Sequence, residues 1–200
     1  MARTGLKRET KVALIGLVAW FALAFAFGLT GVFANASAQI VAATVWILTV
    51  LLLLGWWKVP AINRWAKSVD LRWLIALHLT RFVGIYFLGL CRQDELACRF
   101  ARPAGIGDTV TAIGAVILLL WPLLRGRRPS KPAIDIWNVF GFLDIFLVVF
   151  AALRVGLVDS PGMAPLRSFP LMLLPTFLVP LIIVSHILIF VRLRTGKLMS

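Results

Sequence analysis

The sequence has 200 residues, of which 61% are hydrophobic and 14% charged. Soluble globular proteins are about 45–50% apolar and about 25% charged, and a chain of this size cannot bury so much apolar surface in one core. The composition therefore excludes a soluble globular domain and also an intrinsically disordered chain. The formal net charge of +13 is typical of a nucleic-acid-binding protein, so the positions of the basic residues must decide between nucleic acid and a membrane surface.

Six apolar segments reach or approach the length of about 20 residues with which a helix crosses a bilayer. In chain order they are residues 12–34, 40–57, 71–90, 104–124, 134–158 and 169–191. The fourth reaches full length only if residues 104–108 enter the membrane. Because little sequence remains between the segments, we predict an all-α fold, a single polytopic membrane bundle over residues 1–200 with six transmembrane helices and no extramembrane domain.

The basic residues are concentrated in the segments that lie on one side of this predicted bundle. Fifteen fall on that side and five on the other, which by the positive-inside rule predicts that both termini are cytoplasmic in a bacterial inner membrane. The fifteen are Arg3, Lys7, Arg8, Lys11, Lys58, Arg64, Lys67, Arg72, Arg125, Arg127, Arg128, Lys131, Arg192, Arg194 and Lys197, and the five are Arg92, Arg99, Arg102, Arg154 and Arg167. We therefore interpret the net charge as an orientation signal and an attraction to anionic lipid headgroups, and we predict no nucleic-acid partner.

Residues 1–38 also have the pattern of a secretory signal peptide, with a basic start, an apolar stretch and Ala36-Ser37-Ala38 before Gln39. Cleavage there would leave five transmembrane helices and place the new N-terminus outside. We favour the uncleaved chain, because the apolar stretch is longer than the about 7–15 residues of a signal-peptide core. N-terminal sequencing of the membrane-inserted protein distinguishes the two.

The two cysteines, Cys91 and Cys98, both lie in the predicted outer loop after the third segment. On the oxidising side of a bacterial inner membrane two neighbouring cysteines form a disulfide readily, and we favour a disulfide over two unpaired thiols. The loop is short, so the expected stabilisation is on the order of 2–3 kcal/mol.

The stretch that follows, residues 99–108, is the least lipid-like connection in the chain. Its Pro103 and its glycines are expected to break the helix, and Asp108 is expected to cap the fourth helix. Arg99 and Arg102, with Asp108, then form a candidate site for an anion or a lipid phosphate in the outer loop. The alternative is that the two arginines pair with the acidic residues nearby, which are Asp94, Glu95 and Asp108.

Charged side chains inside membrane helices are costly and usually face the interior of a bundle. Five residues are candidates for such a buried polar cluster: His78, Arg81, Asn138, Asp144 and His186. At a rise of about 1.5 Å per residue, the two histidines lie about 8–10 Å from the cytoplasmic ends of their helices. Arg81 and Asp144 both lie about 15 Å from those ends. The pattern predicts one level with both histidines and a second with the arginine and the aspartate.

Each pair allows more than one interpretation. Arg81 and Asp144 form either a neutralising ion pair that links the third and fifth helices or a pair that responds to protons or ions. His78 and His186 either make separate hydrogen bonds or are the axial ligands of one b-type haem. A transition-metal site built from both histidines and an aspartate is a third alternative, although we predict no metal site.

The sixth segment contains Pro170, Pro175 and Pro180 ahead of His186. Pro170 is in a position to start the helix, whereas Pro175 and Pro180 each remove a backbone donor and bend it. We expect a bent helix beside a buried histidine, which suits a gate or a cofactor pocket and is also common as plain packing.

Three stretches carry a resemblance to a known family: residues 78–84 (HLTRFVG), 100–108 (FARPAGIGD) and 137–144 (WNVFGFLD). They resemble motifs of small uncharacterised bacterial multi-spanning inner-membrane proteins, and the similarity extends over residues 70–190. The resemblance implies the same topology and singles out these residues, but it implies no activity.

The leading functional hypothesis is proton-linked transport or sensing of a small solute by the buried polar cluster. The alternatives are a b-type haem protein of an electron-transfer chain and a structural subunit of a larger membrane complex, with a homo-oligomer as a further partner hypothesis. The sequence has no phosphate-binding glycine loop and no zinc-protease, lipase or c-type haem motif. This favours a protein that is not an enzyme.

Overall fold

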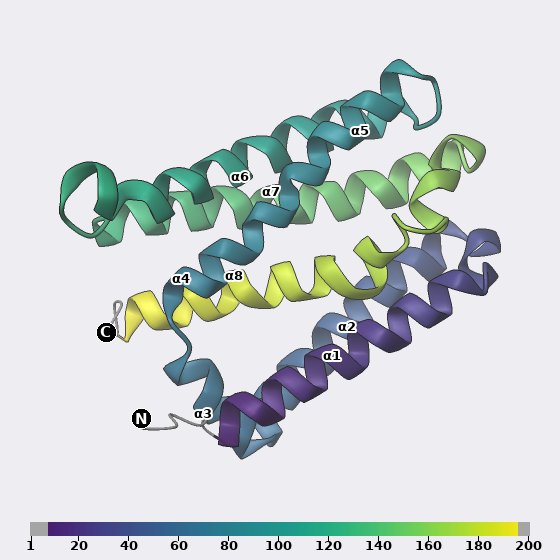
Figure 1. The fold of residues 1–200 in the computed structure, drawn as a ribbon. Coiled ribbons are helices and arrows are strands. Elements are labelled where there is room, and N and C mark those ends of the chain that lie inside the picture. The colour runs from purple at the N-terminus through teal and green to yellow at the C-terminus, as the bar shows by residue number, and fades with distance from the viewer. Residues whose placement is uncertain (1–7, 196–200) are drawn as a thin grey trace, which may run out of the picture.

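The computed structural model describes residues 8–195, which are almost entirely helical and include no strand. Figure 1 shows the helices packed side by side. The α-helices are α1 (Arg8–Leu29), α2 (Ala38–Lys58), α3 (Pro60–Ser68), α4 (Leu71–Leu77), α5 (Val83–Arg92), α6 (Cys98–Arg125), α7 (Lys131–Val158) and α8 (Val179–Arg194). Short 3₁₀ segments are η1 (Val32–Asn35), η2 (His78–Phe82) and η3 (Pro161–Arg167), and η4 (Leu174–Leu178) is a π-helical turn.

Six helical stretches within residues 8–195 are long and apolar enough to cross a membrane, as the sequence predicts. The third consists of α4, η2 and α5 in line, and the sixth of η4 and α8. The first stretch ends at Leu29 rather than near residue 34. The sixth begins at Leu174, so the expectation that Pro170 starts it is wrong: residues 168–172 form turns, and Pro175 falls in the π-helical turn instead.

The fourth helix departs most from expectation, because α6 is continuous from Cys98. Pro103 lies inside it and removes only one hydrogen bond, close to the helix start, which membrane helices tolerate. The glycines that predicted an irregular loop are instead contact points. A Cβ built on Gly105 would lie 2.6 Å from the carbonyl oxygen of Gly84 in α5, so the two helices meet backbone to backbone.

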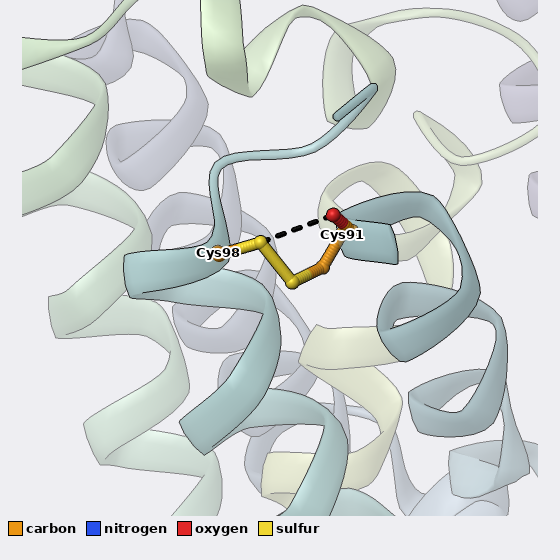
Figure 2. Close-up of a disulfide and its surroundings, with 2 residues drawn as sticks. All are labelled: Cys91 and Cys98. Atoms are coloured by element: carbon orange, nitrogen blue, oxygen red, sulfur yellow. Dashed lines mark hydrogen bonds between the residues drawn. A yellow bond between two sulfur atoms is a disulfide. The ribbon is translucent and has the colours of Figure 1, made fainter. Parts of the chain in front are cut away.

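A disulfide joins Cys91 at the end of α5 to Cys98 at the start of α6, which confirms the predicted pairing (Figure 2). The two Cα atoms are 4.9 Å apart. The bond ties together the ends of the two helices whose glycines are in contact.

The start of α1, the end of α8, α3 and the α6–α7 turn all lie at one end of the molecule (Figure 1). Twelve of the fifteen basic residues assigned to this side belong to those segments or to the neighbouring helix ends, while Arg3, Lys7 and Lys197 lie outside the described residues. Helix α3 was not predicted. It is a short amphipathic helix that begins with Pro60 at its first position, a favoured residue there because it has no N–H to satisfy.

The interior is divided into three layers along the helix axes. One apolar cluster, around Phe100, Ile145 and Ile183, fills the half that contains the disulfide. A second, around Leu71 and Ile189, fills the other half. Seven polar side chains of the third, fourth, fifth and sixth stretches lie between these two clusters, six of them buried and Asp144 half-buried. We call this middle layer, defined by His78, Arg81, Asp108, Asn138, Asp144, Ser185 and His186, the polar layer.

Candidate functional site

Arg81 is the centre of the polar layer and uses three of its nitrogen atoms. Its Nε donates to Asp108 Oδ1 at 2.6 Å, its Nη1 donates to the carbonyl oxygen of Gly141 at 2.9 Å, and its Nη2 donates to Asp144 Oδ2. The side chain of Arg81 is 1% exposed, that of Asp108 6% and that of Asp144 14%. One guanidinium therefore links η2, α6 and α7 in a setting almost without solvent.

Small residues make this arrangement sterically feasible. Because Gly84 and Gly105 lack side chains, α5 approaches α6 closely enough for Arg81 to reach Asp108. A Cβ built on Gly107 would collide with the carboxylate of Asp144, so the bare backbone of α6 also leaves room for the second aspartate. Close contact through glycine is the usual way in which membrane helices gain packing energy.

The 3₁₀ segment η2 places the two candidate residues of the third stretch, His78 and Arg81. In a 3₁₀ helix residues three apart are eclipsed, so His78 and Arg81 project to the same side of the stretch. Both are buried, whereas Phe82 at the end of η2 is exposed. A mid-helix 3₁₀ segment often marks a functional hinge, and here it coincides with the polar layer.

The two histidines face each other across the third and sixth stretches, with ring centroids 4.2 Å apart. Ser185 donates its hydroxyl proton to the carbonyl of Ile182 at 2.8 Å, so His78 Nε2, at 3.0 Å from the hydroxyl oxygen, is the donor to Ser185. His186 Nδ1 donates to Asn138 Oδ1 at 2.8 Å, and the amide of Asn138 donates to the carbonyl of His186 at 3.2 Å.

These hydrogen bonds leave one nitrogen on each imidazole without a partner. His78 Nδ1 and His186 Nε2 are buried and make no hydrogen bond within the described part of the chain. With the tautomers set by Ser185 and Asn138, each free nitrogen carries a lone pair. Such atoms are uncommon in protein interiors, and here both belong to the same pair of rings.

The histidine pair does not fit a b-type haem. Axial ligands approach the iron from opposite faces of a porphyrin, which therefore lies between the two imidazoles. Here the rings are in direct contact, and Trp137 packs edge-on against His78 at 5.0 Å between centroids. A Cβ on Gly141 would lie 2.8 Å from His186 Cε1, so the other side of that ring is filled as well.

The candidate outer-loop site of Arg99, Arg102 and Asp108 is not assembled in this form. Asp108 neither caps a helix nor pairs with the loop arginines, because α6 begins at Cys98 and carries Asp108 into the polar layer. Arg99 and Arg102 lie on the exposed surface of the first turns of α6 and form no ion pair with a described residue. The alternative in which they pair with Asp94, Glu95 or Asp108 is also absent among residues 8–195.

All five residues of the predicted buried cluster lie in the polar layer, with Arg81 and Asp144 paired and the histidines adjacent. Sequence reasoning assigned Asp108 to a different site and did not single out Ser185 as a specific partner of His78. A signal for Asp108 does exist. Arg81 lies three residues before Gly84 and Asp108 three after Gly105, so two antiparallel helices that cross at these glycines bring the two charges to one level.

Three hollows border the polar layer. A small hollow of about 80 Å³ has Arg81 and Asp108 in its lining, which is otherwise almost entirely apolar. A groove of about 1110 Å³ lies between α6 and α7, with Asp144 in its lining. A third, of about 550 Å³, lies among α1, α2, α3, α4 and α8 at the opposite end of the molecule and includes Ser185. Polar groups of the layer are thus in the linings of grooves on both sides of it.

The described chain is therefore an all-helical protein with six helical stretches apolar enough to cross a membrane and a charged network in its interior. Residues 37–194 match the family described as "Domain of unknown function (DUF8737)", and the chain belongs to this family. The match includes every residue of the polar layer and leaves α1 outside. No curated protein and no solved structure matches the chain.

Proposed function

We propose that this protein is an integral membrane protein in which the polar layer takes up and releases a proton during transport or sensing of a small solute. The observation that carries the proposal is the charge balance at Arg81, where one guanidinium faces two carboxylates. With both ionised the buried group has one negative charge in excess, which is costly inside a membrane. A proton on either carboxyl neutralises the group, so proton uptake is the simplest way to keep it stable.

Asp144 is the carboxyl with access to the surroundings. Its side chain is the most exposed of the three charged groups, and it lines the groove between α6 and α7. Asp108, by contrast, has a side chain that is 6% exposed and lines the small apolar hollow. We infer that protons exchange with the outer side through Asp144.

The histidines extend the polar layer toward the other side. Gly141, whose carbonyl accepts from Arg81, also packs against His186. His186 contacts His78, and His78 bonds to Ser185, which lines the groove at the opposite end. The two imidazole nitrogens without partners are proton acceptors along this path. The series supports a proton route from one groove to the other.

The same proposal includes orientation and location. The bias of basic residues supports a bacterial inner membrane with both termini in the cytoplasm, anionic headgroups as contacts of the basic end, and the groove of Asp144 on the outer side. Neither a homo-oligomer nor a larger membrane complex is required for the proton route.

Infrared spectroscopy of the purified protein tests the central step. We expect a C=O stretching band of a protonated carboxyl, sensitive to deuterium exchange, that disappears on alkaline titration and is lost or shifted in Asp144→Asn and Asp108→Asn. Asp135→Asn, an exposed aspartate on α7, is the matched control and should leave the band unchanged. A folded protein with no such band at any pH at which it remains folded contradicts the proposal.

Proton flux into vesicles that contain the protein and a trapped pH-sensitive dye tests the route. Under an imposed pH gradient we expect slower flux for Asp144→Asn and for His186→Phe than for the unaltered chain, because each removes a proton-accepting group. Flux through the unaltered chain no faster than in vesicles without protein would indicate proton binding without conduction, which favours sensing over transport.

A further inference from the structure

The groove between α6 and α7 has a charge pattern that the proton route does not explain. Two arginines line it, Arg99 in the first turn of α6 and Arg154 in the last turns of α7. Both are exposed, and neither has an ion pair or hydrogen bond to a described residue. Of the two carboxylates of the groove, Asp144 pairs with Arg81, whereas Asp159 accepts only from the neutral amide of Gly162, at 3.0 Å. Two arginines against one carboxylate without an ion pair leave the groove with an excess of positive charge.

The two arginines lie at nearly the same level. Gly107 of α6 lies against Asp144 of α7, and the helices run antiparallel. From this contact Arg99 is eight residues along α6 and Arg154 ten residues along α7 toward the same end, about 12 and 15 Å at 1.5 Å per residue. Both guanidinium groups can thus contact one ligand at the end of the groove, while Asp144 lies at its deep end.

The walls of the groove are apolar below the arginines. Leu147 and Phe150 of α7 line it and are 66% and 62% exposed, and Ala104 and Ala151 leave space between the helices. Its volume of about 1110 Å³ is slightly above the usual range of about 300–1,000 Å³ for ligand sites. A ligand that fits this pattern has an anionic group at one end and an apolar chain that extends toward the bilayer centre.

We propose that the α6–α7 groove binds a phospholipid, with its phosphate between Arg99 and Arg154 and an acyl chain along Leu147 and Phe150. Arginine is well suited to phosphate because its planar group makes two parallel hydrogen bonds. The inference rests on insertion of the six helices in a membrane and does not depend on proton exchange. It replaces the outer-loop site predicted from the sequence, with Arg154 in place of Arg102 and Asp108.

Native mass spectrometry of the full chain in an uncharged detergent, titrated with phosphatidylglycerol, tests the proposal. We expect one tightly bound lipid, whose affinity falls on the order of tenfold or more in Arg99→Gln/Arg154→Gln, since charge-assisted hydrogen bonds are lost. Arg102→Gln is the matched control, because Arg102 is an exposed arginine of the same helix end that does not line the groove. Its affinity should stay within about twofold.

A second variant tests whether the lipid needs the volume of the groove, independently of the charge of its arginines. Ala151→Phe fills the groove without removing an arginine and should also abolish tight lipid binding. Glycerol 3-phosphate at the same concentration should not displace the lipid, and a diacylglycerol with the same chains should not bind tightly. The proposal is overturned if Arg102→Gln weakens binding as much as the double variant, if neither groove variant has an effect, or if the free phosphate ester competes equally. Helical circular dichroism shows that each variant is folded.

Discussion

Arg81 makes three hydrogen bonds that lysine or glutamine at the same position could not reproduce. Its guanidinium donates in three directions, to two carboxylates and one backbone carbonyl, from a position that is 1% exposed. A lysine ammonium is a compact charge without this planar geometry. The arrangement explains how two aspartates from neighbouring helices coexist in an apolar interior.

A double-mutant cycle tests this account of Arg81. Arg81→Gln leaves two buried carboxyls without a counter-charge and should lower the free energy of unfolding by about 3–5 kcal/mol. Adding Asp144→Asn removes one of the two acids, so the double variant should be more stable than Arg81→Gln alone, by about 1 kcal/mol or more. Denaturant unfolding in detergent, followed by circular dichroism, measures both values.

The exposed Arg102 provides the control, and Arg102→Gln should change the unfolding free energy by less than about 0.5 kcal/mol. If the loss of unfolding free energy in the double variant equals the sum of the losses in Arg81→Gln and Asp144→Asn, the two side chains do not interact energetically. That result would contradict the charge-balance argument.

At the scale of single residues, sequence reasoning placed Arg81, Asp144 and the histidines at matching depths because helix rise converts position into depth. It could not place Asp108, because a proline and two glycines within five residues (103–107) indicate a loop in most contexts. In this chain the glycines allow the helices to come into contact. The position of Asp108 is indicated by the spacing of the glycines from Arg81 and Asp108, and not by their low helix propensity.

Helices α5 and α6 form the closest contact between elements, held at one end by the disulfide and near the middle by Gly84 and Gly105. A Cβ on Gly84 would lie 2.5 Å from the carbonyl oxygen of Gly105. Backbone cannot move aside as a flexible side chain can, so any side chain at Gly84 must separate the helices. The separation would also pull Arg81 away from Asp108.

Gly84→Ala should therefore destabilise the protein by about 1–3 kcal/mol, as overpacking generally does. Gly89→Ala is the matched control on the same helix, since a Cβ there would have no atom within 4 Å. It should be neutral or stabilising by up to about 1 kcal/mol, because alanine is the better helix former. Thermal unfolding of the two variants in detergent decides the point, and equal stability would show that α5 and α6 are not in backbone contact.

The elements were predictable to the extent that apolar length determines them. Long apolar runs predict the number of helical stretches that are apolar enough to cross a membrane, and capping residues agree with several starts, such as Ser37 before α2 and Ser130 before α7. The amphipathic α3 and the turns before Leu174 depend on packing around the ends of the bundle. Neither has a run of apolar residues long enough to be recognised.

For the whole molecule, the proposed function depends on the order of the layers, in which the polar layer lies between two apolar clusters. Grooves reach the polar layer at Asp144 and Ser185. The direction of any proton movement, and the leaflet that supplies a lipid to Arg99 and Arg154, both depend on which end of the molecule is cytoplasmic.

Cysteine labelling determines this orientation with two matched positions. Ser130, in the α6–α7 turn, and Ser160, after α7, are both exposed serines at opposite ends of the same helix. The native cysteines are bonded to each other and do not react. Most basic residues lie at the end of the molecule that contains Ser130, and the positive-inside rule predicts that this end is cytoplasmic. A membrane-impermeant maleimide should therefore label Ser160→Cys in spheroplasts and Ser130→Cys only after permeabilisation. The reverse pattern would place Arg99 and Arg154 in the cytoplasmic leaflet, and labelling of both positions in sealed cells would contradict a membrane-spanning α7.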